Sequence, residues 1–341
     1  MNKTLTLLLV SCIFLSNNTY AYKYALGSCL DQDLEQPIWA AIEKQDIDGF
    51  IFLGDNVYGD QKSGELGKLK KAYKKQKNRI PLWLYQKKIL AIWDDHDYGE
   101  NDGGGDYKNK QEAQKLFLDF WEISKNDPRR TREGIFFEET QQIEGKKIHF
   151  IGLDTRYFRS ELKVKKNGYL ANDDPNASVL GNEQWDWLDR TLEESKADIV
   201  IILSSIQILA TNHRFEKWSN FTVDRKKLLT RIDGLMQDKK VILISGDRHR
   251  AGLYQKGNLI EITASALNKG SSRPIETDPL LLGKTYPQTN FGVLNIEPSK
   301  VKDIDYFYLG SLTKSQKESL KYLGIKNGLR ETHPTSLLSI S

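Results

Sequence analysis

Several short apolar runs of this chain end abruptly in side chains that bind metals or exchange protons. They are residues 49–53 before Gly54-Asp55, residues 89–93 before Asp94-Asp95-His96-Asp97, and residues 241–245 before Gly246-Asp247-Arg248-His249. Continuous apolar runs of this length are typical of strands that are covered on both faces, as in parallel sheets. Ligands of open α/β sheets bind at the carboxyl ends of the strands. The pattern therefore predicts an α/β fold with one site shared by several strand ends.

The remaining periodicity completes the α/β alternation. Further strands are expected at residues 24–28, 147–153 and 198–203, and helices at residues 35–44, 63–78, 110–121, 182–195 and 224–237. Residues 253–296 show shorter strands and Gly-rich turns. The length of 341 residues favours one large domain, which we expect over residues 22–300, with residues 301–341 as an extension that packs on it.

The composition excludes two broad classes of protein. Hydrophobic residues make up 39% of the chain and charged residues 28%, a globular balance that is not typical of disorder. The net charge of +4 arises from 50 basic and 46 acidic residues that are interleaved, so no nucleic-acid partner is expected. The basic run from Lys68 to Lys77 is interpreted as a solvated helix face, with a patch for anionic substrates or lipid head groups as the alternative.

The N-terminal segment has the layout of a secretory signal peptide. Lys3 precedes an apolar stretch that ends at Leu15, and a polar stretch then leads to Ala21. We expect cleavage after Ala21, and we expect the mature protein to be periplasmic or secreted. A lipoprotein anchored through Cys12 is the less favoured alternative, because its apolar region would be unusually short.

Cysteine usage singles out one residue. The chain has two cysteines, Cys12 and Cys29, so removal of residues 1–21 leaves Cys29 alone and excludes an intramolecular disulfide. A lone thiol is either an inert buried side chain or a metal ligand protected by coordination. The strand-end motifs favour the ligand.

The residues at the strand ends form a mixed set of hard and soft donors. The candidates are Cys29, Asp55, Tyr58, Asp95, His96, Asp247 and His249. Carboxylates suit calcium, magnesium or manganese, whereas thiolate and imidazole suit iron or zinc. A carboxylate on a Gly-Asp turn can bridge two cations, and two cations can clamp the attacking and leaving oxygens of a phosphoryl displacement. His96 would then donate a proton to the leaving alkoxide.

Taken together, the motifs resemble the PhoD-like (alkaline phosphatase D) family of the metallophosphoesterase superfamily. The resemblance runs from about residue 24 to residue 296 and rests on Gly27-Ser28-Cys29, Gly54 to Asp60, Trp93 to Asp102, Leu153 to Arg156, Gly181 to Leu188 and Ser245 to His249. Ser204 to Gln207 stands where other members of the superfamily carry a metal-binding His. The stretch from Trp93 to Asp102 is the most diagnostic of these motifs.

The resemblance implies a fold, a metal set and an activity. The fold would be a four-layer αββα sandwich of two mixed sheets flanked by helices. Fe³⁺ and Ca²⁺ would be the cofactors, with Mn²⁺, Mg²⁺ or Zn²⁺ as alternatives, held by Cys29, a bridging Asp55, Tyr58, Asp95, Asn101, Asp247 and His249. His96 and Arg156 would be catalytic, and Arg156, Tyr98 and Gln207 would contact the substrate.

The activity implied is hydrolysis of phosphomonoesters or phosphodiesters by a metal-activated water or hydroxide, with teichoic acids and phospholipids among the family's substrates. The first motif directly follows the predicted signal peptide, which leaves no room for the N-terminal β-domain of longer members. Two alternatives stay open: a phospholipase-type phosphodiesterase at a membrane surface, and a non-catalytic member that binds a phosphoester. We expect a monomer, although no oligomer signal is present.

Other polar and aromatic residues receive weaker predictions. Residues 101–107, with three consecutive glycines, form either a mobile loop over the site or a plain surface loop. His149 is expected to be a satisfied core histidine, His213 an outside candidate for the site, and His333 a surface residue. Two roles, contact with the substrate and a structural role, stay open for Tyr98, Arg159, Trp218 and Phe221.

Overall fold

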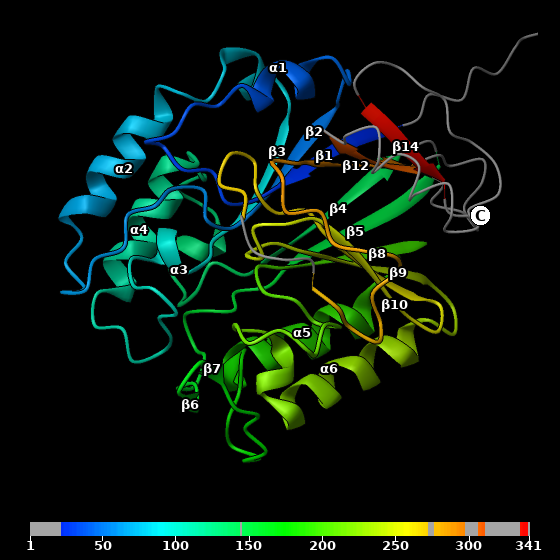
Figure 1. Ribbon diagram of the computed structural model, residues 1–341. Helices are drawn as coiled ribbons and strands as arrows, with labels where there is room; N and C mark the ends of the chain where they lie inside the picture. Colours follow the sequence, from blue (N-terminus) through cyan, green and yellow to red (C-terminus); the bar gives the residue numbers. More distant parts are fainter. Residues whose placement is uncertain (1–21, 144, 272–275, 297–305, 311–334, 340–341) are drawn as a thin grey trace, which may run out of the picture.

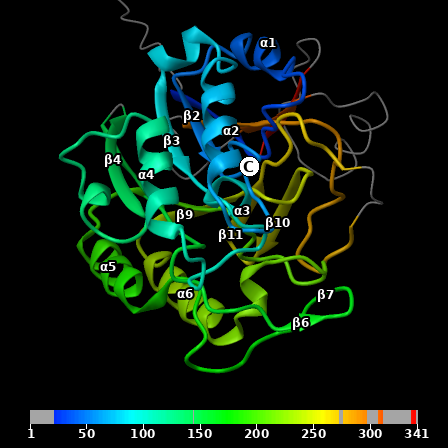
Figure 2. The ribbon, with the colours of Figure 1, turned by 90° about the vertical axis from the view of Figure 1, so that its left-hand side faces the viewer.

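The computed structural model describes residues 22–143, 145–271, 276–296, 306–310 and 335–339. Two six-stranded sheets lie face to face, and helices cover their outer sides (Figures 1 and 2). The predicted four-layer αββα sandwich of mixed sheets is therefore confirmed. The predicted signal peptide, residues 1–21, and His333 lie outside the described residues.

The first sheet has the strand order β14-β13-β12-β1-β2-β3. Its centre is parallel, because β1 pairs with β2 and β2 with β3 in the same direction, whereas β12 runs antiparallel to β1. The strands are β1 (Tyr22–Gly27), β2 (Gly49–Leu53), β3 (Lys88–Ile92), β12 (Gly292–Ile296), β13 (Tyr306–Gly310) and β14 (Thr335–Ser339).

The second sheet has the strand order β10-β11-β9-β8-β5-β4. Four neighbouring strands are parallel, and the two edge strands β4 and β10 are antiparallel to their neighbours. The strands are β4 (Phe137–Ile143), β5 (Lys146–Gly152), β8 (Ile199–Ser204), β9 (Lys240–Ser245), β10 (Gly252–Lys256) and β11 (Leu259–Thr263). A small separate ribbon joins β6 (Val164–Lys165) to β7 (Gly168–Tyr169).

The helices divide between the two sheets. In Figure 1, α1, α2 and α4 lie on the outer side of the first sheet, and α5 and α6 cover the second. Their bounds are α1 (Ile38–Glu43), α2 (Gly67–Lys77), α3 (Asp95–Tyr98), α4 (Lys110–Phe120), α5 (Gly181–Glu194) and α6 (Thr222–Leu235). Short 3₁₀ turns are η1 (Leu82–Gln86), η2 (Pro128–Arg130) and η3 (Trp218–Asn220).

The apolar runs are strands buried on both faces, as predicted. Successive side chains of a strand point to opposite faces, so each central strand supplies two cores. In β8, Ile201 belongs to the core that the two sheets share, whereas Ile202 belongs to the core beneath α5 and α6. The burial of β2 and β8 is complete along their lengths, which is why their sequences show no alternation.

Edge strand β4 is the element that the sequence pattern misses. Its sequence FEETQQI is polar, and only Phe137 and Ile143 at its two ends are fully buried. An edge strand with one face toward water reads as polar, because only its inner face meets the core. Helix α1 also begins later than expected, at Ile38, directly after Pro37.

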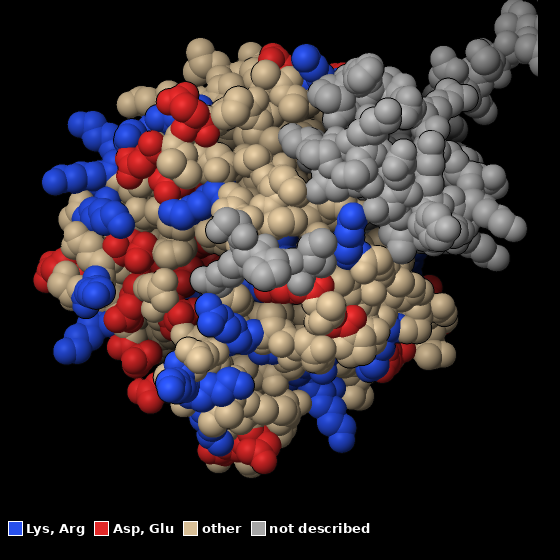
Figure 3. All heavy atoms as spheres, in the orientation of Figure 1, with Lys and Arg blue, Asp and Glu red and all other residues tan. Residues whose placement is uncertain are grey.

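The lysines of the 68–77 run form the exposed face of α2, while Leu69, Ala72, Tyr73 and Gln76 face inward. Three of these lysines pair with carboxylates: Lys70 with Glu112, Lys75 with Asp33 and Lys77 with Glu122. Figure 3 shows basic and acidic side chains interleaved on this side of the molecule. The solvated-face interpretation is the one that this pattern favours. Within the described residues, none of the helices combines the length and the apolar character that a membrane crossing requires.

Candidate metal centre

The carboxyl ends of the two sheets meet at one point. Gly246, which follows β9 of the second sheet, lies so close to the first sheet that an added Cβ would approach Leu53 O to 2.5 Å and Ser28 Cβ to 2.9 Å. Ser28 O in turn accepts hydrogen bonds from Ala266 N and Leu267 N, which follow β11. Because of this close approach, candidate ligands after β1, β2 and β3 face those after β9.

Four of the candidate ligands share a rare backbone conformation. Cys29, Asp55, Asp247 and His249 have φ angles of 57°, 52°, 63° and 51°, in the left-handed region that non-glycine residues seldom adopt. Such a conformation costs about 1–3 kcal/mol per residue and persists where the surroundings enforce it, which is often at functional sites. The backbone of the turns after β1, β2 and β9 is therefore strained, and in this conformation it directs these side chains toward one another.

Asp55 is the centre of the cluster. Among the described residues, three groups hold donor atoms that all lie within 4.8 Å of one another: Cys29 with Asp55 and His249, Asp55 with Asp95 and His96, and Asp55 with Asp94 and Asp247. Asp55 belongs to all three groups and is fully buried. Burial and the neighbouring Cys29 and Asp95 raise the pKa of Asp55 well above its usual range, although His96 opposes this. A cation between these groups would remove that penalty.

The softer donors lie on one side of Asp55. Cys29 Sγ is 3.5 Å from Asp55 Oδ2, and the Tyr58 hydroxyl lies 3.0 Å from the same oxygen and 3.3 Å from His249 Nε2. Burial raises the pKa of the Cys29 thiol to about 11 and that of Tyr58 well above 10.0. A metal ion at this side would favour the thiolate and phenolate that burial otherwise disfavours.

Carboxylates dominate the other side of Asp55. Asp95 Oδ1 and Asp94 Oδ2 are buried, and no described residue donates a hydrogen bond to either atom. Buried carboxylate oxygens without a donor are costly unless a cation binds them. These two orphaned oxygens and Asp247 are a donor set that suits a hard cation such as Ca²⁺, Mg²⁺ or Mn²⁺. The residues present therefore fit a metal centre with a softer and a harder half.

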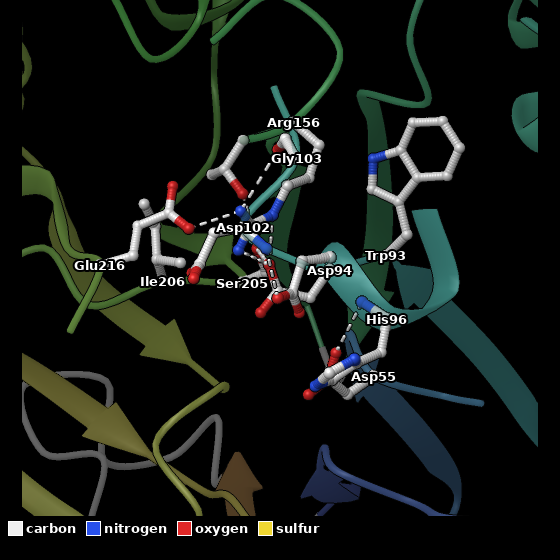
Figure 4. Close-up of polar contacts among 12 residues, drawn as sticks. Asp55, Trp93, Asp94, His96, Asp102, Gly103, Arg156, Ser205, Ile206 and Glu216 are labelled. Carbon is white, nitrogen blue, oxygen red and sulfur yellow. Dashed lines mark hydrogen bonds and ion pairs between the residues drawn. The ribbon is translucent and has the colours of Figure 1, made fainter. Parts of the chain in front are cut away.

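His96 lies beside Asp55 on the first turn after β3. Its Nδ1 is 2.7 Å from Asp60 Oδ1, and its backbone N donates to Asp55 Oδ1 at 3.3 Å (Figure 4). Burial alone would lower the pKa of His96, but Asp95, Asp55 and Asp60 raise it to about 11. With Nδ1 occupied by Asp60, the Nε2–H of His96 is left for the pocket, of which His96 forms part of the wall.

Arg156 lies beneath the cluster and is not among the residues that line the pocket. Its side chain is 1% exposed, and its guanidinium contacts Asp94 Oδ1 through Nε at 2.6 Å and Glu216 Oε2 through Nη1 at 2.5 Å (Figure 4). Glu216 also pairs with the buried Arg159. Both arginines are thus engaged with two carboxylates beneath the cluster, so Arg156 positions Asp94 rather than facing a phosphate.

Two further residues that were predicted to contact the substrate lie inside the fold. Tyr98 is fully buried and donates its hydroxyl hydrogen bond to Gly104 O, while Gln207 is fully buried and donates to Thr263 Oγ1. Neither side chain is part of the pocket wall, because both pack inside the fold. Asn101, in contrast, is exposed and lines the pocket, where it donates to Asp102 Oδ2.

The glycine loop after Asn101 is tied down rather than free. Gly104 O accepts a hydrogen bond from Tyr98, Gly105 N donates to Arg159 O, and the Lys110 ammonium donates to Gly105 O. Trp218 and Phe221 belong to the core beneath α5 and α6 and not to a substrate wall. His149 is a satisfied buried histidine, with Ser195 and Glu138 as partners.

Sequence reasoning missed several residues that line or support the site. Asp94 joins the metal groups next to the predicted Asp95, and Asp60 orients His96. Both stand inside the quoted motifs, so their carboxylates were a readable signal. Phe215, Arg248 and Glu276 line the pocket beside the cluster, yet the stretch around Phe215 carries no motif.

Comparisons with known proteins agree with this geometry. A model of the PhoD-like phosphatase family matches residues 85–277, which is more than half of the chain. No sequence among the curated proteins matches significantly. The solved structure of PhoD is similar with a TM-score of 0.64 and 16% identity, over 85% of this chain but only 65% of that chain's length.

Two other solved structures share the fold. GAP50, the anchor in the inner membrane complex of Plasmodium, is similar with a TM-score of 0.56 and 14% identity, over 94% of this chain and 89% of that one. Purple acid phosphatase PPD1 from yellow lupin seeds has a TM-score of 0.50 and 12% identity, over 86% of this chain and 51% of that one. At these identities the likeness concerns the fold alone. By its sequence motifs and by the match over residues 85–277, the chain belongs to the PhoD-like phosphatase family.

Proposed function

We propose that this chain is a secreted, metal-dependent phosphoester hydrolase that holds iron and calcium. The observation that carries the proposal is the sharing of the buried Asp55 by three groups of metal-binding side chains at the wall of one pocket. Cys29, Tyr58 and His249 would hold the iron with Asp55, because thiolate, phenolate and imidazole suit it. Asp94, Asp95 and Asp247 would hold the harder cation with Asp55.

Each part of this site has a separate chemical task. When bound, the cations supply Lewis acidity toward a phosphoryl oxygen and lower the pKa of a water molecule. Asp55 would be shared by the two halves of the site, and the ion pair of Arg156 with Asp94 holds one carboxylate in place. His96, held by Asp60, offers its Nε2–H to the leaving alkoxide.

Metal analysis and hydrolysis assays on one sample of the purified protein test the proposal. Iron with calcium, together with hydrolysis of p-nitrophenyl phosphate or bis-p-nitrophenyl phosphate, is the expected result. The two substrates also separate monoester from diester preference. A protein that binds no metal, and that no added metal activates, would contradict the proposal and would leave the clustered carboxylates to a structural explanation.

Replacement of His96 by Gln should depress turnover without loss of metal. General acid catalysis contributes about 10²–10⁴-fold, so kcat should fall within that range for an alkyl phosphate, whose leaving group needs a proton. The loss should be smaller for p-nitrophenyl phosphate, whose leaving group departs as a stable anion. An equal loss for both substrates would argue against proton donation by His96.

The matched control for His96 is His149→Gln. His149 is also buried and also bonded to a carboxylate, Glu138, but it lies away from the pocket. That variant should retain kcat for both substrates.

Secretion is the remaining part of the proposal, and it rests on the layout of residues 1–21. The mature protein recovered from the expressing cells should begin at Tyr22, as read by N-terminal sequencing or mass spectrometry. A lipid-modified N-terminus at Cys12 would support the lipoprotein alternative instead.

A further inference from the structure

The pocket beside the metal centre extends well beyond the candidate ligands. It has a volume of about 420 Å³, which is in the range of pockets that hold small organic ligands. Past Asp247 and His249, its wall continues over Phe215, Arg248, Arg250 and Glu276. This end of the pocket has no task in the hydrolysis of a simple phosphate ester.

Two buried guanidinium groups share one carboxylate at this end. Arg248 and Arg250 have side chains that are 5% and 2% exposed, and both pair with Glu276, at 2.5 Å and 3.6 Å. Arg248 also lies over the ring of Phe215, with 4.7 Å between the guanidinium carbon and the ring centroid. Its Nε is buried, and no described residue accepts a hydrogen bond from it.

Two more basic side chains lie near these arginines. Lys217 is buried, and its ammonium donates only to Phe215 O among the hydrogen bonds of the described residues. Burial and the charge of Arg248 lower its pKa to about 8. Burial, Arg248, Lys217 and Arg250 lower the pKa of His213, whose ring lies 6.3 Å from that of Phe215. His213, Lys217, Arg248 and Arg250 are called the basic cluster below.

The other carboxylates near the basic cluster are engaged elsewhere. Asp247 is near enough to Arg248 for that arginine to lower its pKa, but it belongs to the candidate metal donors. Glu216 is near enough to raise the pKa of Lys217, but it already pairs with Arg156 and Arg159. Asp278 is near enough to raise the pKa of Lys217, but its oxygens accept hydrogen bonds from Thr211, Asn212 and Leu280.

The ion-pair network of Arg156 provides an internal comparison. There, two guanidinium groups face two carboxylates, Asp94 and Glu216, so the charges balance. In the basic cluster, Arg248 and Arg250 both pair with the single carboxylate of Glu276. A buried charged donor is costly unless an acceptor compensates it. The buried Nε of Arg248, to which no described residue offers an acceptor, points to a ligand that brings negative charge.

From this geometry we infer that the basic cluster is a second anion subsite, which binds a phosphate group of the substrate other than the one hydrolysed. The inference rests on the proposed function, because the metal centre sets where the reacting phosphate lies. A guanidinium group matches phosphate oxygens in a two-pronged hydrogen bond, and Arg248 retains an unused donor for it. The preferred substrates are therefore esters that carry two or more phosphates.

A substrate series of matched pairs tests the subsite. Straight-chain diol bisphosphates of increasing length are compared with alkyl monophosphates of the same length, with release of inorganic phosphate as the measure. Hydrogen bonds to charged groups contribute about 1.5–3 kcal/mol, so kcat/KM for the best bisphosphate should exceed that of its monophosphate by roughly 10- to 100-fold. The same ratio should fall toward one in Arg248→Gln and decrease partly in Arg248→Lys.

Controls separate this loss from damage to the neighbouring metal ligands. Metal content and the melting temperature show whether Arg248→Gln keeps its fold. Lys217→Gln is a second variant, at a position farther from the ligands in sequence, and it should also lower the ratio. It serves as the test if Arg248→Gln fails to fold. Arg231→Gln removes an exposed arginine of α6 that pairs with Asp189, and it should keep the wild-type ratio.

The outcomes distinguish the subsite from the proposed function. A wild-type ratio near one across the whole series, or a high ratio that persists in both Arg248→Gln and Lys217→Gln, would overturn the subsite while leaving hydrolysis intact. If the metal-loaded protein hydrolyses no ester, the proposed function fails instead. In that case, calorimetry gives the dissociation constants of the same bisphosphates and monophosphates. The ratio of these constants then decides whether the subsite exists.

Discussion

Replacement of Asp55 by Asn should remove activity and lower metal content together. Residues that merely support a ligand contribute about 10- to 100-fold to metal affinity or activity, and Asp55 is shared by all three donor groups. We therefore expect kcat/KM to fall by more than about 100-fold. Elemental analysis of the same sample should show loss from both halves of the site, because Asp55 belongs to the donor groups of both halves.

The control for this variant is Asp224→Asn. Asp224 is also a buried aspartate, and it accepts hydrogen bonds from Ser178, Val179 and Trp185 far from the metal donors. It should lose stability but keep its metal content. Full activity in Asp55→Asn would contradict a shared metal centre, and loss of activity with full metal content would restrict Asp55 to a role in catalysis.

Among the substitutions proposed, replacement of Arg156 by Leu should cause the largest decrease in the free energy of unfolding. The substitution leaves the buried Asp94 without its cation, and Glu216 keeps only its ion pair with Arg159. Breaking a buried ion pair from one side costs about 3–5 kcal/mol. Urea unfolding of the metal-free protein measures this cost directly as a change in the free energy of unfolding.

An exposed ion pair provides the comparison for Arg156. The pair of Arg231 with Asp189 is about half accessible on the arginine side, and surface pairs contribute about 0–1 kcal/mol. Arg231→Leu should therefore unfold close to the wild type. If Arg156→Leu also unfolded like the wild type, the network under Asp94 would have no stabilising role, and a direct role of Arg156 in substrate binding would return as the explanation.

The fold was predictable because its central strands are simple in sequence. Strands such as β2 and β8 are buried on both faces, so an unbroken apolar run is the expected pattern, and the turn residues after them mark their ends. Strand β4 was not predictable, because a sheet edge that faces water on one side resembles a polar loop in sequence.

The candidate ligands were predictable for the same reason. Polar groups that directly follow a buried strand need partners, and the carboxyl ends of parallel strands are the edge where such groups gather. The meeting of the two sheets through Gly246 could not be read from sequence, since it depends on how the sheets pack.

The buried ion pairs of Arg156 could not be predicted, because its partners are remote in sequence. Asp94 is 62 residues away and Glu216 is 60 residues away, so nothing near Arg156 identifies it as one member of a buried ion pair. An arginine after a strand end equally resembles a phosphate-binding residue. The basic cluster was hidden for the same reason, since Phe215 and Lys217 come from a loop far from Arg248 in sequence.

The close packing around Gly246 also bears on how the protein folds. Two of the three donor groups combine residues that follow strands of both sheets, so they are complete only when the sheets have packed together. A ligand that binds only the native state stabilises it in proportion to the logarithm of its concentration over its dissociation constant. Metal binding should therefore favour the native packing of the two sheets. A chain whose sheets have packed in the wrong alignment lacks these complete donor groups and does not gain this stabilisation.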